Sequence, residues 1–351
     1  MLQVYRLNRA DEWDRIVRSF REYDVYYLSG YVKNAYRTDG TEALLFFYED
    51  KELRGINVAV RRDVKELPVF SRIHLPRRYS DLVTPYGYGG WLLEGTGDVS
   101  ALDRAYTAWC RKNNIVSEFV RIHPVIGNER YMEGFYDIIR KGSVVIMDLS
   151  SPETVWSNLE CNLRSRVRRA REAGLTVSHS NSPEILEEFQ TVYRQTMDKV
   201  GAADYYYYDA DYFRELRKDL PHNMEVFYIR TGDGKIIAAT LFLGVNGRLS
   251  GHLGGSLQEY LHLNPVCLLH TEAAVWGAEN GYRTLNLGSG LGFSEDNLLM
   301  SKRDYNRRGL TSHFFGHKVF DPEAYRYLTE TAGAGQEKDF FPAYRKQGLT
   351  P

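Results

Sequence analysis

The sequence predicts an α/β protein with two similar domains. The chain has 351 residues, which corresponds to about two domains at roughly 150 residues each. Segments with apolar residues at helical spacing alternate with short strand-like segments bounded by turn residues. The two halves also share a layout. Trp109 and Trp276 each lie five residues before a helix stop, Asn114 or Gly281, and a strand follows each stop.

The N-terminal domain is assigned to residues 1–142. Its first helix is indicated by apolar positions at helical spacing, namely Trp13, Ile16, Val17 and Phe20. The hairpin that follows has a polar turn between two apolar runs. The expected elements are a strand at 2–7, a helix at 10–23, a hairpin at 42–64, a helix at 100–114 and a strand at 117–124.

The C-terminal domain is assigned to residues 143–330, and residues 331–351 are expected to form a loosely ordered tail. After a first strand, the Ser-Pro-Glu sequence at 151–153 is typical of a helix start and opens one long helix. The later elements are helices at 182–200 and 209–221, strands over 224–256 with turns at 232–234 and 246–247, a helix at 265–281 and a strand at 283–288.

Composition and charge narrow the function classes. Lys and Arg total 45, and Asp and Glu total 46, so the chain has no overall positive charge. A DNA-binding protein is therefore disfavoured. Three distant cysteines, Cys110, Cys161 and Cys267, lack metal or disulfide spacing and fit a reducing compartment. The N-terminus has no apolar signal segment, and no apolar run approaches the ~18 residues of a membrane span. We therefore expect a cytoplasmic protein without a metal site, which can still act on a substrate at the membrane surface.

Five arginines crowd the stretch that begins at Asn162. On a helix, an apolar stripe accompanies them, formed by Leu159, Leu163, Val167 and Ala170. One row is expected to face a phosphate-bearing substrate or tRNA through guanidinium donors, and it comprises Asn162, Arg166 and Arg169. The other row is expected in solvent and comprises Arg164, Arg168 and Arg171. The alternative interpretation is a solvated amphipathic helix whose last-turn arginines complement the helix dipole.

Glycines follow two predicted strands in the C-terminal half, in "HLGGS" and "NLGSG". At such strand ends they allow the backbone to approach a ligand closely. Together with "EDNLLMSKRDYN", these segments resemble the Fem-type transferases. The arginine helix from Asn162 to Gly174 and the segment "SDLVTPYGYGGWL" are also similar to segments of that family. The resemblance implies two tandem domains with an N-acetyltransferase-like (GNAT) fold, mixed central sheets flanked by helices, and a cleft between or along the domains.

The resemblance and the chemistry of individual residues together indicate a set of site residues. Lys302 would stabilise a developing negative charge or a substrate phosphate, and Asp296 would orient Lys302 or the attacking amine. His252 is a candidate base. The expected substrate-binding residues are Lys33, Tyr86, Asn162, Arg166, Arg169, Tyr206, Tyr207, Gly288, Ser289, Gly290 and Tyr305. The family's Phe-Lys-x-x-Phe context is replaced here by residues 301–305, Ser-Lys-Arg-Asp-Tyr.

The function expected from this resemblance is amide formation on an amine of a cell-wall or glycan precursor. Its acceptor would be nucleotide- or lipid-linked, and its donor an aminoacyl-tRNA used as a cosubstrate, with no tightly bound cofactor. An acyl-CoA-dependent N-acyltransferase acting on an amino sugar or another small amine is the alternative. The usual pyrophosphate loop, (R/Q)-x-x-G-x-(G/A), is missing between the "HLGGS" strand and its helix. A non-catalytic binding protein with the same fold is the second alternative.

Overall fold

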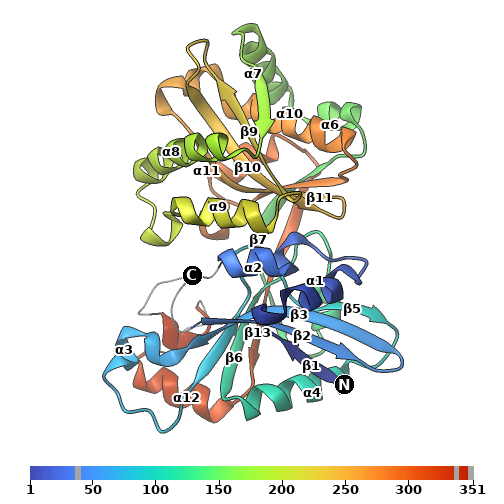
Figure 1. Ribbon diagram of the computed structural model, residues 1–351, viewed down its shortest axis with the longest axis vertical. Coiled ribbons are helices and arrows are strands. Elements are labelled where there is room, and N and C mark those ends of the chain that lie inside the picture. Colours follow the sequence, from blue (N-terminus) through green and yellow to red (C-terminus); the bar gives the residue numbers. More distant parts are fainter. Residues whose placement is uncertain (36–40, 336–339, 347–351) are drawn as a thin grey trace. The chain divides into compact units, whose positions relative to one another are not determined.

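The computed structural model describes residues 1–35, 41–335 and 340–346 (Figure 1). The chain forms two compact units, of which unit 1 comprises Met1–Lys141 with His313–Pro351 and unit 2 comprises Gly142–Ser312. Strands β7 (Asp137–Asp148) and β13 (Leu310–Val319) carry the chain from one unit to the other. The division differs from the expected end of the C-terminal domain at residue 330, because β13 pairs antiparallel with β6 (Ile115–Arg121) of unit 1.

Unit 1 contains a mixed sheet in the order β1-β2-β3-β4-β6-β13, with β5 paired to β3. Strands β4 and β6 run parallel, and antiparallel ladders join the neighbouring pairs β1–β2, β2–β3, β3–β4 and β6–β13. The expected hairpin is β2–β3, whose turn is closed by Asp50 accepting from the backbone N–H groups of Glu52 and Leu53. The remaining strands are β1 (Leu2–Tyr5), β2 (Thr41–Glu49), β3 (Leu53–Asp63), β4 (Ser80–Val83) and β5 (Leu92–Gly95).

The core of unit 1 is dominated by aromatic side chains. Tyr106 of helix α4 packs edge-on against Phe46 and Trp91, with ring centroids 4.8 and 5.1 Å away. Such edge-to-face pairs stabilise a core beyond simple burial. The helices of this unit are α1 (Ala10–Arg18), α2 (Ser29–Ala35), α3 (Pro68–Ser71), α4 (Val99–Lys112), α5 (Glu129–Met132) and α12 (Pro322–Thr331). The first helix is shorter than expected, because Ser19 closes its last turn with bonds to the carbonyl of Ile16.

The described part of the expected loose tail is packed into unit 1. Tyr344 is only 1% exposed, and its hydroxyl donates to Asp81 at 3.2 Å. Arg345 also bonds to Asp81, which is fully buried and receives a third hydrogen bond from Arg62 at 2.8 Å. A buried carboxylate needs such partners because desolvation penalises its charge. Residues 336–339 and 347–351 of the predicted tail lie outside the described residues.

Unit 2 contains a second mixed sheet, in the order β7-β12-β11-β10-β9-β8. Strands β11 and β12 are parallel, but their pairing stops at Ser250 and Asn286 while β11 continues to Ser256. The ladder between β10 and β11 also has a bulge, because Leu241 and Phe242 pair with Leu253 and Gly251. The strands are β8 (Val177–Ser180), β9 (Met224–Arg230), β10 (Ile236–Val245), β11 (Arg248–Ser256) and β12 (Thr284–Gly288).

Helices cover both faces of this second sheet. Thr240 on β10 reaches His270 of α10, whereas Gly255, which pairs with the adjacent Ala239, faces α8. Because successive strand residues point to opposite faces, α8 and α10 lie on opposite sides of the sheet. Helices α6 and α7 pack on α10, and α9 packs on α8. The helices are α6 (Pro152–Asn158), α7 (Cys161–Glu172), α8 (Pro183–Val200), α9 (Ala210–Asp219), α10 (Pro265–Glu279) and α11 (Asn297–Arg303).

The single long helix expected after residue 151 is divided into α6 and α7. Leu159 and Glu160 adopt extended backbone conformations between them, with ψ of 141° and 150°. The N–H group of Glu160 bonds instead to the carbonyl of Asp304 at 2.8 Å, a partner that the local sequence does not reveal. The predicted apolar stripe is nevertheless fully buried, at Leu159, Leu163, Val167 and Ala170.

Candidate active site around Lys302

Lys302 lies on α11 and is held against the turn that follows β12. Its Nζ donates to the main-chain carbonyl of Ser289 at 2.6 Å. Gly288 has φ of +76°, a conformation that favours glycine, and a Cβ there would lie 3.6 Å from Nζ. The Ser289 hydroxyl donates to the carbonyl of Ser143 on β7 at 2.6 Å and anchors the turn. The structure therefore brings the expected Gly288, Ser289 and Lys302 together.

The lysine is an unusually acidic ammonium group. Burial lowers the pKa of Lys302 to about 8, and the charge of Asp296 opposes this effect. A cation with so little solvation interacts strongly with any negative charge that develops nearby. At neutral pH most of the Lys302 population still carries its charge, since its pKa remains above 7.

Asp296 caps the helix that carries Lys302. Its carboxylate accepts from the N–H of Leu299 at 2.9 Å and from that of Leu291 at 2.8 Å. These backbone hydrogen bonds lower the pKa of Asp296. Gly290 is needed beside this cap, because a Cβ there would lie 2.2 Å from Asp296 Oδ1. Asp296 thus orients α11, and through it Lys302, by capping the N-terminus of the helix.

His270 and Tyr305 form the support beneath the lysine. Burial and the charge of Lys302 lower the pKa of His270 to about 4, so its ring is neutral at pH 7. The ring lies 3.2 Å from the hydroxyl of Thr240 and its centroid is 5.6 Å from that of Tyr305. Tyr305 is 5% exposed and donates to the carbonyl of Val266 at 3.2 Å. Tyr305 was expected to contact substrate, but its burial under α10 makes it a packing residue.

The arginine helix reaches this site through one side chain. Arg166 forms an ion pair with Asp304 at 2.5 Å, and both groups are largely shielded from solvent. Asp304 follows Lys302 by two residues, so the pair ties α7 to the end of α11. Asn162 and Arg169, expected in the same substrate-facing row, are exposed on α7. The three residues of the row therefore do not share one environment. Because the apolar stripe is buried, only Arg166, the middle residue of the row, is directed toward Asp304.

The second arginine row has partners of its own. Arg164 is half-buried, and it donates to the carbonyl of Leu159 at 2.8 Å beyond the end of α6. Arg171 pairs with Glu272 at 2.6 Å. Arg168 lies over the ring of Trp156, 5.8 Å from its centroid. Arg168 and Arg171 are exposed as expected, whereas Arg164 hydrogen-bonds to the backbone at the break between α6 and α7.

His252 occupies the bulge of β11, where its Nε2 lies 2.8 Å from the hydroxyl of Tyr212. Burial lowers the pKa of His252 to about 3. A ring with so low a pKa is a weak base at neutral pH. The hydrogen bond joins the bulged strand to α9.

The expected acceptor-binding residues occupy both units. Tyr206 and Tyr207 lie at a short turn after α8, where Tyr207 donates to Asp198 at 3.0 Å. Lys33 is exposed on α2 of unit 1. The carbonyl of Tyr86, also in unit 1, accepts from the hydroxyl of Tyr31.

Sequence reasoning missed one residue of this site, His270. It lies in α10, a largely apolar helix whose few polar residues do not gather on one face, so periodicity does not distinguish one face from another. The only local signal is a histidine within an otherwise apolar run. Among residues 1–35, 41–335 and 340–346, no group of three or more His, Cys, Asp or Glu side chains is placed to hold a metal ion. Within the same ranges, every helix is too short or too polar to cross a bilayer.

One domain family and several solved structures resemble this chain. The family model for the acetyltransferase (GNAT) domain matches residues 157–293. The crystal structure of FemX matches with a TM-score of 0.68 and 14% identity, over 93% of this chain and 99% of that one. The C-terminal domain of a putative lysylphosphatidylglycerol synthetase from Agrobacterium fabrum matches with a TM-score of 0.55 and 15% identity, over 93% and 95%.

L-PGS from Bacillus licheniformis is also similar, with a TM-score of 0.52 and 15% identity, over 88% of this chain and 91% of that one. No curated protein sequence matches the chain. These findings confirm the α/β fold and its two GNAT-like domains. The resemblance to Fem-type transferases is thereby confirmed at the level of the fold.

Proposed function

We propose that this protein is an acyltransferase that forms an amide on an amine of a cell-wall or glycan precursor. The observation that carries the proposal is the desolvated Lys302 ammonium, held beside the Gly288–Gly290 turn at the end of β12. The acetyltransferase domain model matches residues 157–293, which include the Gly288–Gly290 turn but end before Lys302, and this match supports acyl transfer. The likeness to FemX and to lysylphosphatidylglycerol synthetases supports an aminoacyl group as the cargo.

In the proposed reaction, the acceptor amine attacks the carbonyl carbon of an aminoacyl ester. The new N–C bond forms, the ester C–O bond breaks, and the proton lost by the amine ends on the leaving oxygen. Negative charge develops on the carbonyl oxygen in between, and the Lys302 ammonium would stabilise it. Asp296 and the Arg166–Asp304 pair would hold Lys302 in position.

The acceptor we propose is a nucleotide- or lipid-linked glycan or peptide precursor, met in the cytoplasm or at the membrane surface. Such precursors carry phosphates, which the exposed cation Arg169 of unit 2 is suited to bind. Tyr206 and Tyr207 of the same unit would contribute apolar surfaces with hydroxyl donors. Aminoacyl-tRNA is the proposed donor.

An acyl-CoA donor is the second candidate, and the acetyltransferase domain match favours it. Strands β11 and β12 stop pairing after Ser250 and Asn286. Beyond this point, main-chain N–H and C=O groups of the two strands are no longer paired with one another, and a donor could bind there. Against it, the segment between β11 and α10 is a 3-10 turn, Gln258–Leu263, without the glycine loop that cradles a pyrophosphate. Stabilisation of the purified protein by CoA alone in a thermal shift assay would favour this donor.

The proposal is tested by transfer of a radiolabelled amino acid from charged tRNA to an acceptor identified by co-purification mass spectrometry. Lys302→Ala is expected to lower kcat by about 100-fold, as loss of an oxyanion-stabilising group does elsewhere. Lys199→Ala, on the exposed end of α8, is the matched control and should retain full activity. Binding without transfer from either donor would favour the second alternative, a non-catalytic binding protein. Full turnover by Lys302→Ala would remove this lysine from the mechanism.

A further inference from the structure

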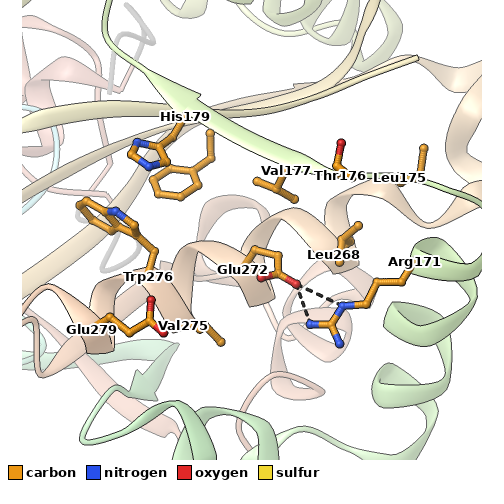
Figure 2. A pocket seen from close by; sticks show the side chains of 11 residues that line it. Arg171, Leu175, Thr176, Val177, His179, Leu268, Glu272, Val275, Trp276 and Glu279 are labelled. Carbon is orange, nitrogen blue, oxygen red and sulfur yellow. Dashed lines mark hydrogen bonds and ion pairs between the residues drawn. The ribbon is translucent and has the colours of Figure 1, made fainter. Parts of the chain in front are cut away.

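A cavity of about 390 Å³ lies on a different face of α10 from the residues that serve Lys302 (Figure 2). Its volume falls in the range of small-molecule sites. The floor consists of residues at helical spacing, Leu268, Glu272, Val275, Trp276 and Glu279. Strands β8 and β9 and the end of α7 complete the walls. Since about 100° separates successive helix residues, His270 points away from this floor.

One wall of the cavity is aromatic. The ring of Trp276 lies 5.3 Å from Phe227 and 5.4 Å from His179, centroid to centroid. His179 stacks on Phe227 at 5.0 Å, with 22° between the ring planes. Phe227 is buried and Trp276 is half-buried, so the wall is supported from behind and open on the cavity side. Aromatic surfaces of this kind receive flat apolar groups and cations.

The charged groups of the cavity leave one carboxylate without a cation. Arg171 donates twice to Glu272, at 2.6 and 3.2 Å, and the two charges offset each other. Glu279 forms no ion pair with any residue in the described part of the chain. Figure 2 shows Glu279 and Trp276 at one end of the cavity and the Arg171–Glu272 pair at the other. One arginine against two glutamates gives the Arg and Glu side chains of the lining a net formal charge of −1.

We propose that this cavity binds a small organic cation, an ammonium group joined to an aromatic or branched apolar body. The apolar body would pack on Trp276 and Phe227, and the ammonium would lie beside Glu279. Both the uncompensated charge and the aromatic wall favour a cation over an anion or a neutral ligand. The site is separate from that of the proposed transfer reaction and does not depend on it.

The test uses phenethylammonium chloride as the probe and phenethyl alcohol as its neutral counterpart, titrated calorimetrically into the full chain. The cation is expected to bind, and the alcohol to bind at least about fivefold more weakly. Glu279→Gln should weaken cation binding by about fivefold or more without changing the affinity for the alcohol. Trp276→Leu should weaken both probes, with thermal melting used to show that the variant is folded.

Two control variants separate this site from general effects. Glu187→Gln removes the same charge from an exposed position on α8, across the sheet, and should leave binding unchanged. Lys302→Ala should also bind the cation normally. The proposal is overturned if the parent protein does not bind the cation, if both probes bind equally, or if Glu187→Gln matches Glu279→Gln. Loss of binding in Lys302→Ala would likewise overturn the proposal, because it would show that the probe binds at the Lys302 site.

Discussion

Replacing Lys302 by methionine is expected to stabilise the protein while lowering its proposed activity. Burial lowers the pKa of Lys302 from 10.5 to about 8, which penalises the charged form by about 3 kcal/mol at 1.36 kcal/mol per pH unit. Methionine is similar in length and carries no charge. It leaves the carbonyl of Ser289 without its donor, a loss of about 1–2 kcal/mol. A net gain of about 1–2 kcal/mol in unfolding free energy at pH 7 should remain.

The gain should depend on pH in a defined direction. The folded-state pKa lies below the unfolded one, so charged Lys302 costs stability in full below pH 8. As the pH rises from about 8 to 10.5, the folded state releases its proton first and the cost disappears. Between pH 8 and 10.5, the unfolding free energy of the parent protein should therefore rise relative to that of Lys302→Met. Above this interval, the variant should be the less stable protein.

Urea unfolding of both proteins, followed by tryptophan fluorescence at several pH values, measures this difference. Lys199→Met, which replaces an exposed lysine on α8, is the control and should show little change at any pH. A Lys302→Met variant that is less stable than the parent at pH 7 would refute the reasoning, and so would a difference that does not vary with pH. Either result would mean that the lysine is better solvated than its position indicates.

Three further predictions concern the packing around the two sites of buried charge. Arg166→Ala should lower transfer activity by about tenfold or more through the lost pairing with α11, whereas Arg171→Ala should change it less than about twofold; equal effects in the transfer assay would remove Arg166 from the site. Arg345→Ala should destabilise unit 1 by about 3 kcal/mol in urea unfolding, since it leaves Asp81 with one cation fewer; an unchanged midpoint would contradict this. Gly290→Ala should cost about 1–3 kcal/mol by displacing the carboxylate that caps α11, and wild-type melting would show that the cap can move.

The position of the candidate site was partly predictable. Gly288, Ser289 and Lys302 are adjacent in the structure as the resemblance implied, because a strand end and the following helix are close in sequence. The roles of individual side chains were less accessible. Tyr305 carries the pattern of a substrate contact but is buried, and desolvation lowers the pKa of His252 to about 3, which makes its ring a weak base. Burial of a polar side chain depends on what packs over it, and sequence spacing does not report that.

The sequence by itself determined the features that arise within a few residues. The apolar stripe of α7 and the β2–β3 hairpin follow from helical period and turn chemistry, both of which are local. The tertiary structure alone decided that Arg166 meets Asp304, 138 residues away, and that residues 313–335 and 340–346 join unit 1. It also decided the acidity of Lys302, because desolvation is set by every chain segment that surrounds the ammonium.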